Sequence, residues 1–184
     1  MKRSVVGLLL GMASYAFGGW LVSRFFILQE VRVQQVGVPF SDPVFDLLPA
    51  ADVSVAIFSI TYGSIVLFLI TNYKQIEKIA VFGFAAGILQ LFRILTMFFL
   101  PLEAPRDLVS LNDPFLNELI YPSDITTDLF FSGHTATLFI LYFITKRWWF
   151  LVGGIGIMIL LMIQRVHYSI DVIVAIPFAF LCVW

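Results

Sequence analysis

Two short stretches of this sequence each place a histidine beside groups that suit phosphate chemistry. The first is Ser132-Gly133-His134-Thr135, followed by an apolar run over residues 136–144. Serine is a favoured helix N-cap, so the run predicts a helix that begins directly after it. The first amides of such a helix lack an internal partner and form a ready site for an anion. We therefore expect Ser132, Gly133 and His134 to lie at a phosphate-binding site.

The second stretch is Arg165-Val-His167-Tyr-Ser-Ile-Asp171. His167 and Asp171 are four residues apart, so they share a face if both stand on one helix. The carboxylate can then accept a proton from one ring nitrogen and leave the other nitrogen free to act. Spacing alone also allows a simpler interpretation, in which each histidine is an interfacial residue with a backbone partner.

The composition indicates an integral membrane protein. Of the 184 residues, 60% are hydrophobic and 12% are charged, and the mean hydropathy is +0.98. A soluble domain of this size could not hide so much apolar surface. The single cysteine, Cys182, excludes an internal disulfide and a cysteine metal cluster. The net charge of −1 and the absence of a basic run predict no nucleic-acid partner.

Six apolar runs have about the length that a helix needs to cross the hydrocarbon layer. They predict one transmembrane domain over residues 1–184, with spans at residues 4–28, 53–71, 79–100, 129–145, 148–164 and 167–184. The first run could instead be a signal peptide, because small residues surround Ala13–Ala16. Apolar sequence continues past them, which favours a retained span. The sixth run stops at Trp184 without a basic flank, which leaves a continuation of the chain open.

The distribution of charge predicts the topology. With a cytoplasmic N-terminus, a set of cationic residues falls inside: Lys2, Arg3, Lys74, Lys78, Lys146 and Arg147. The two long outer loops carry acids instead, as the positive-inside rule requires. We expect an all-α, six-helix bundle with both termini in the cytoplasm. Arg93, His134, Arg165, His167 and Asp171 then lie near the outer ends of spans three to six, and this predicts one site there.

Two chemistries could use these residues. Two histidines and an aspartate could bind zinc. However, the helix-start amides and the arginines Arg93 and Arg165 suit an anion and repel a metal. We therefore expect phosphate chemistry that needs no metal and no other cofactor. Each arginine taken singly could also extend to the lipid headgroups at the end of its span.

The two stretches resemble the catalytic motifs of the type 2 phosphatidic acid phosphatase superfamily, and more closely those of its sphingomyelin synthase branch. There the motifs read roughly Gly-Asp-x-x-x-Ser-Gly-His-Thr and His-Tyr-x-x-Asp-Val. The first motif falls on residues 128–135, with Asp128 at the aspartate and Thr127, just before them, where glycine is usual. The second falls on residues 167–172, within the stretch 165–172. Two weaker similarities to that branch lie at residues 39–46, in the first outer loop, and at residues 93–97, in the third span.

The resemblance implies a six-span bundle with a phosphatidic acid phosphatase-like core and a phosphohistidine mechanism. Carried over by position, His167 attacks phosphorus, Asp171 orients and charges its imidazole, and His134 protonates the leaving alkoxide. Two arginines and the helix-start amides would stabilise charge on the phosphate oxygens. The residues expected to bind the phosphate or the rest of the substrate are Ser132, Gly133, Arg165, Arg93 and Asp128.

One departure concerns the phosphatase branch of the superfamily. Its Lys-x6-Arg-Pro motif is absent here, and Leu161 stands where that branch has an arginine six residues before the nucleophilic histidine. The missing residues favour the synthase-like branch. Eukaryotic members of that branch are longer and carry an extra N-terminal domain that we do not expect here, so donor and acceptor lipids do not transfer safely from them.

We expect an enzyme of the outer leaflet that transfers a phospho-headgroup from a phospholipid to a lipid alcohol such as ceramide or diacylglycerol. Water as the acceptor would make the same site a lipid phosphate phosphatase or a phospholipase C-type hydrolase. A different class is a non-catalytic transporter, lipid-binding or scaffold protein, whose polar residues line a pathway. The headgroup, the acceptor, the membrane and the oligomeric state, including a homo-oligomer, are left open.

Overall fold

A computed structural model of the chain describes residues 2–113 and 131–184. Within these residues the protein is all-α, with six α-helices, one 3-10 helix and no sheet. The elements in chain order are α1 (Lys2–Val36), η1 (Pro43–Leu47), α2 (Ser54–Asn72), α3 (Ile76–Phe99), α5 (Gly133–Thr145), α6 (Trp148–Gln164) and α7 (Ser169–Val183). The all-α class expected from the sequence is confirmed.

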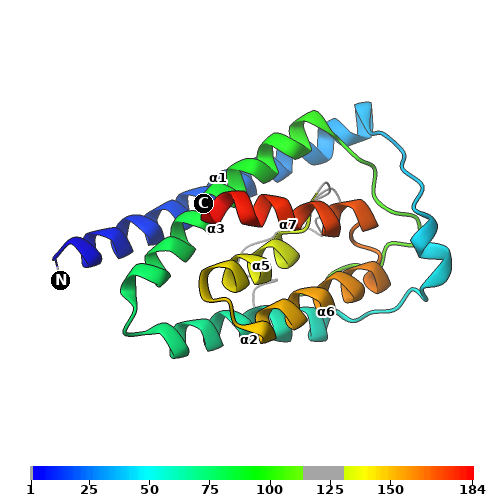
Figure 1. Cartoon of the computed structure of the whole chain (residues 1–184). Helices are drawn as coiled ribbons and strands as arrows, with labels where there is room; N and C mark the ends of the chain where they lie inside the picture. Colours follow the sequence, from blue (N-terminus) through cyan, green and yellow to red (C-terminus); the bar gives the residue numbers. More distant parts are fainter. Residues whose placement is uncertain (1, 114–130) are drawn as a thin grey trace.

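Helix α5 is the central helix of the bundle. It packs against α2, α3, α6 and α7, and Figure 1 shows it between α7 and the pair formed by α2 and α6. Its residues Ala136, Leu138, Ile140 and Leu141 are fully buried. A helix that is apolar on all sides is one that other helices surround. The first turn of α5, which carries His134, is therefore held by several neighbours.

Helices α1 and α3 lie side by side (Figure 1) because glycines let their backbones approach. A Cβ atom added at Gly83 would come within 2.6 Å of the backbone of Gly11, and one at Gly18 within 2.9 Å of the Gly87 carbonyl oxygen. Small residues at the contact between two helices are typical of packing within membranes. The pair therefore depends on the absence of side chains at these positions.

Helix α1 ends later than the predicted first span, which stops at residue 28. Gln29 donates a side-chain hydrogen bond to the carbonyl of Met97 at 2.9 Å, and Arg32 donates one to the carbonyl of Phe98 at 2.6 Å. The last carbonyls of a helix lack internal partners, so these side chains satisfy the end of α3. The polar residues after 28 thus extend the helix because α3 offers them acceptors.

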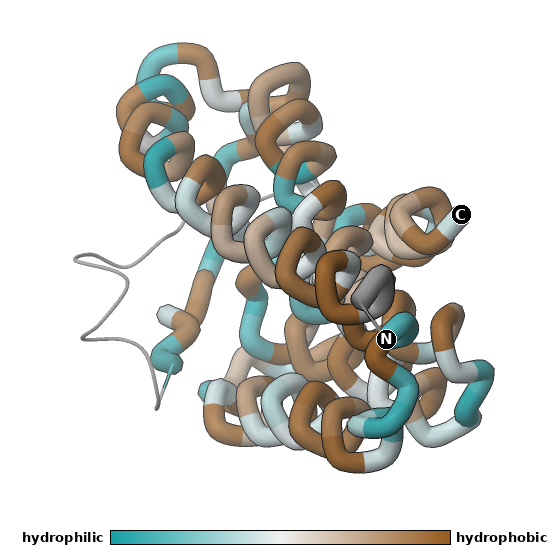
Figure 2. Tube along the Cα trace, turned by 90° about the vertical axis from the view of Figure 1, so that its left-hand side faces the viewer, coloured by the Kyte–Doolittle hydropathy of each residue, from teal (hydrophilic) through white to brown (hydrophobic). Residues whose placement is uncertain are grey.

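In the part of the chain that the structure describes, three helices are long and apolar enough to cross a membrane: α2, α3 and the Val5–Val36 part of α1. Helices α5, α6 and α7 are also apolar but have 13, 17 and 15 residues. Figure 2 shows hydrophobic residues along most of the helical length. The predicted spans 129–145 and 167–184 are longer than α5 and α7, the helices that lie within them. The reason is local, since Ser132 and Tyr168 are N-caps and the helices begin only after them.

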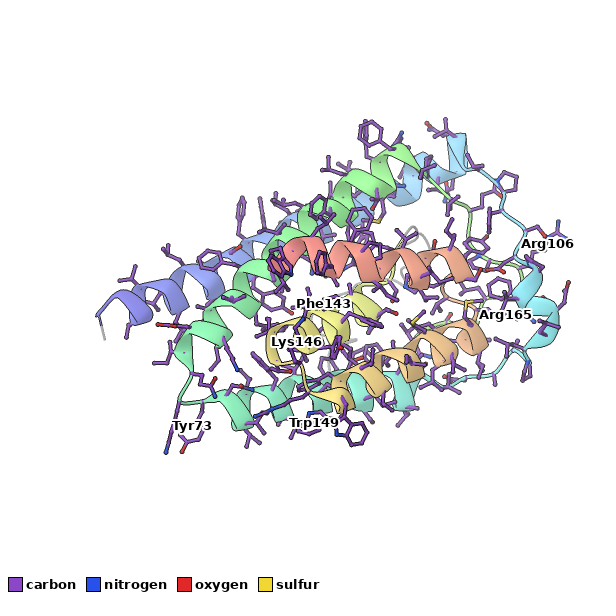
Figure 3. All side chains as sticks on the ribbon, viewed as in Figure 1. Tyr73, Arg106, Phe143, Lys146, Trp149 and Arg165 are labelled. Atoms are coloured by element: carbon purple, nitrogen blue, oxygen red, sulfur yellow. The ribbon has the colours of Figure 1, made fainter. Side chains whose placement is uncertain are left out.

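The turns between the helices lie at two opposite ends of the bundle (Figure 1). The α2–α3 and α5–α6 turns lie at one end, where Tyr73, Lys146 and Trp149 gather (Figures 1 and 3). Helix η1 and the α6–α7 turn lie at the opposite end, with Arg106 and Arg165 (Figure 3). The turns predicted to be cytoplasmic are therefore far from the α6–α7 turn that carries His167.

Candidate active site

The structure brings the starts of α5 and α7 together. The amide of Ser132 donates a hydrogen bond to the carbonyl of Asp171 at 3.3 Å. This bond joins the residue before α5 to the first turn of α7, and both residues are fully buried. The two stretches that the sequence singled out therefore form one region of the molecule.

His167 lies just before α7 and not on it. The helix begins at Ser169 with Tyr168 as its N-cap. Nδ1 of His167 nevertheless lies 3.5 Å from Oδ2 of Asp171. The predicted closeness is confirmed, but the predicted reason, a shared helical face, is wrong. A turn before the helix brings the imidazole back to the carboxylate of the third helical residue.

The pair of His167 and Asp171 is buried, with 4% and 0% of the two residues exposed. Oδ2 of Asp171 accepts a hydrogen bond from the Tyr168 amide at 3.0 Å. Nδ1 of His167 and Oδ1 of Asp171 have no hydrogen-bond partner within the described part of the chain. A buried polar atom without a partner is costly, so a small rotation that forms the Nδ1–H···O bond is favoured. Nε2 is then the nitrogen left to act as a nucleophile.

The predicted N-cap at Ser132 is confirmed. Its hydroxyl oxygen accepts from the Thr135 amide at 3.2 Å, and its carbonyl accepts from the Ala136 amide at 3.0 Å. His134 follows in the first turn and is half-buried. Its ring meets the edge of Phe58 on α2, with 5.4 Å between the ring centroids. His134 therefore stands at the first turn of α5, on the side that meets α2.

Arg93 reaches the start of α5 from α3. A Cβ atom added at Gly133 would lie 3.0 Å from one terminal nitrogen of Arg93 and 3.1 Å from its Cζ. The same guanidinium donates to the side-chain oxygen of Gln90 at 2.8 Å. The start of a helix carries partial positive charge, and the guanidinium adds a second cationic group beside it. Arg93 and the start of α5 thus form an arrangement that suits a bound phosphate.

Arg165 has a different environment. It adopts the left-handed conformation, with φ at 55°, where it ends α6. Its guanidinium donates to the carbonyls of Phe45 and Leu48 at 2.9 and 3.2 Å. These contacts hold η1 against the α6–α7 turn. The predicted phosphate contact of Arg165 stays a prediction, and Asp128 lies outside the described residues.

Sequence reasoning did not place Asp42 at the site. Its Oδ1 accepts from the Val44 amide at 3.0 Å, and its Oδ2 accepts from the amide of Ser169. Asp42 therefore joins η1 to the first residue of α7, two positions after His167. The available signal was its position in the segment 39–46, which resembles the synthase branch.

Sequence reasoning also missed Gln164, the last residue of α6. Its buried side-chain amide donates to the Ser54 hydroxyl and the Ser110 carbonyl, both at 3.0 Å. Its side-chain oxygen accepts from the Val53 amide. These bonds tie the end of α6 to the start of α2 and to the loop after α3 that contains Ser110. An amide side chain at the end of an otherwise apolar run was the signal that could have found it.

Asp52 belongs to the same network. The Ser54 hydroxyl and amide donate to its Oδ1 at 2.7 and 3.0 Å, and Gln164 donates at 3.3 Å. Hydrogen bonds to the charged form lower the pKa of the Asp52 carboxyl below its ordinary value of 3.8. The ionised carboxylate therefore supports the start of α2.

The arrangement as a whole can perform chemistry on a phosphate. It offers a buried histidine beside a carboxylate, a cation at a helix start, and a second histidine on that helix. Within residues 2–113 and 131–184, no three His, Cys, Asp or Glu side chains gather as metal ligands. No protein-family model, curated protein or solved structure matches the chain.

Proposed function

We propose that this protein is a membrane enzyme that moves a phospho-headgroup from a phospholipid to ceramide or diacylglycerol through a phosphohistidine on His167. One observation carries the proposal. The buried His167–Asp171 pair, with 3.5 Å between Nδ1 and Oδ2, is joined to the start of α5, where Arg93 meets Gly133. A nucleophile with an orienting acid beside a cationic phosphate site is what phosphoryl transfer through histidine needs.

In the first step, Nε2 of His167 attacks the phosphorus of the donor lipid. The bond from phosphorus to the glycerol oxygen breaks, and His134 gives its proton to that oxygen as diacylglycerol leaves. Asp171 holds the Nδ1 proton of His167 and balances the positive charge that develops on the ring. Arg93 and the amides that begin α5 stabilise the negative charge on the phosphate oxygens.

In the second step, the neutral His134 takes the proton of the acceptor hydroxyl. The acceptor oxygen attacks phosphorus, the nitrogen–phosphorus bond of His167 breaks, and the new phospholipid forms. Water in place of the lipid alcohol gives hydrolysis by the same residues. The outcome therefore depends on whether the site excludes water and holds a second lipid.

The proposal includes six membrane-crossing helices, cytoplasmic termini and a site that opens to the outer side. Support comes from Lys146 and its neighbours, which lie at the end of the bundle opposite the α6–α7 turn (Figure 3). Helix α5, at 13 residues, is about 20 Å long, which is shorter than a hydrocarbon layer of about 30 Å. In this proposal the starts of α5 and α7 lie recessed from the outer surface, at a depth that the phosphate of an outer-leaflet lipid can reach.

A product assay tests this function. Purified protein and a His167→Ala variant would receive fluorescent ceramide or diacylglycerol in liposomes of phosphatidylcholine or phosphatidylethanolamine, with phosphatidic acid as a parallel sample. We expect a new fluorescent phospholipid from the wild type alone. Free phosphate from phosphatidic acid without transfer would indicate the hydrolase. Equal results for the two proteins in every sample would contradict both enzymes and favour a non-catalytic membrane protein.

A further inference from the structure

We propose that Asp42 is the positioning residue for His167, because it anchors the first turn of α7 to the loop that contains η1. The inference deepens the proposed function and rests on it, since it takes His167 as the nucleophile. Asp42 lies far from His167 in the sequence but is 6% exposed and bonded to the residue two positions after it.

The contact of Asp42 gives the first amide of α7 a partner, next to the bond that the Asp171 carboxylate accepts from the Tyr168 amide. Ser169 is the first residue of α7, and its amide has no partner within the helix. The side chain of the N-cap residue Tyr168 does not serve this end of the helix, because its hydroxyl donates to the Glu103 carbonyl at 2.9 Å. Asp42 supplies the acceptor from another part of the chain. A carboxylate at a helix start is also stabilised by the helix dipole.

The same loop holds the turn that carries His167 at two further points. The ring of Tyr168 packs against Phe40 and Phe45, with centroid distances of 4.9 and 5.8 Å. On the other side of His167, Arg165 donates to the Phe45 carbonyl. Both sides of His167 are therefore attached to one loop, and Asp42 supplies its bond to the first amide of α7.

The position of His167 matters because its hydrogen bond to Asp171 forms only if the two side chains stay close. At 3.5 Å the two atoms are just beyond hydrogen-bond distance. A misplacement of about 1 Å at a reacting group can cost on the order of 10²-fold in rate. We expect the release of Ser169 from Asp42 to shift this turn without removing any group proposed to contact the phosphate.

The test measures phosphorylation of His167 by potassium phosphoramidate, a small donor that needs no lipid. Nε2 of His167 bonds to phosphorus, the phosphorus–nitrogen bond of the donor breaks, and ammonia leaves. Mass spectrometry at neutral pH would give the maximal rate and the half-saturating concentration. Both carboxylate oxygens of Asp42 accept from amides, and asparagine has one oxygen, so its NH2 group would face the amide of Val44 or Ser169 and break the link between them. For Asp42→Asn we therefore expect a maximal rate lower by about 10²-fold with an unchanged half-saturating concentration. Asp46→Asn is the matched control, because Asp46 lies in the same loop and is exposed.

A second variant removes the bond from the other partner. Ser169→Pro deletes the amide proton that Asp42 accepts, and proline suits the first position of a helix. It therefore tests the contact even if Asp42→Asn folds poorly. We expect a loss similar to that of Asp42→Asn, and no further loss in the double variant. Full maximal rates in Asp42→Asn or Ser169→Pro, or losses that multiply, would overturn the inference alone. A wild type unlabelled at His167 would overturn the proposed function together with it.

Discussion

The guanidinium of Arg93 lies directly against Gly133, 3.0 Å from the position that a Cβ atom would take there. The contact joins the middle of the bundle to the start of α5 and brings a cation beside the amides that begin that helix. Glycine at this position is therefore needed for close approach, since any larger residue must displace the guanidinium.

Gly133→Ala should weaken phosphate binding and slow transfer. The added methyl group forces Arg93 to move by a few tenths of an ångström, which we expect to cost about tenfold in rate. The matched control is Gly156→Ala in α6, where a Cβ atom meets nothing within 4 Å. That change should leave activity intact and stabilise α6 by roughly 0.5–1 kcal/mol. Orthovanadate binding and the transfer rate would be measured for both, and equal behaviour of the two variants would contradict the role of the contact.

Asp171→Asn should abolish most activity with little loss of fold. An asparagine oxygen can still accept from the Tyr168 amide, so the start of α7 is kept. However, the amide cannot charge the ring of His167 or hold its Nδ1 proton in the same way. A loss of about 10⁴-fold in kcat is expected from the analogous change in other enzymes with an oriented histidine. The product assay with a thermal unfolding control measures it, and activity within a few-fold of wild type would exclude Asp171 from catalysis.

Sequence patterns predicted the features that depend on neighbouring residues. Ser132 is a local cap signal, and the structure confirms it. The cationic turns at Lys74 and Lys146 lie together at one end of the bundle because short turns between apolar runs leave little choice. The closeness of His167 and Asp171 also follows from spacing, although the turn before α7 was taken for helix.

The remaining features depend on distant partners that local patterns do not contain. Helix α1 extends past residue 28 because α3 presents the Met97 and Phe98 carbonyls to it. Arg165 finds its acceptors in η1, more than a hundred residues earlier. Asp42 caps α7 across a similar separation. Each of these bonds forms only after the helices have packed, so a reading of neighbouring residues could not reveal them.

Gly87→Ala should destabilise the α1–α3 pair. The added Cβ atom would lie 2.2 Å from the Ser14 hydroxyl oxygen and 2.7 Å from the Ser14 backbone, so the helices must separate. Overpacking of this kind costs about 1–3 kcal/mol. Gly19→Ala is the control, because nothing lies within 4 Å of its Cβ position. Unfolding midpoints in detergent should fall for Gly87→Ala alone, and a midpoint equal to that of wild type would show that the helices are not in such close contact.

Asp52→Ala should lower stability near neutral pH and lose this effect in acid. The pKa of Asp52 lies below its ordinary value of 3.8 in the folded protein, because Ser54 and then Gln164 donate hydrogen bonds to the ionised carboxylate. A carboxyl group with a depressed folded pKa contributes stability that is fully present above the unfolded value. That contribution is lost as the pH falls through the folded pKa. The gap in unfolding midpoint between wild type and Asp52→Ala should therefore be largest near pH 7 and narrow below about pH 3.8.

Asp46→Ala, at an exposed position of the preceding loop, is the control and should show no such pH-dependent gap. A gap that stays constant from neutral to acidic pH would mean that the charge of Asp52 does not support the start of α2.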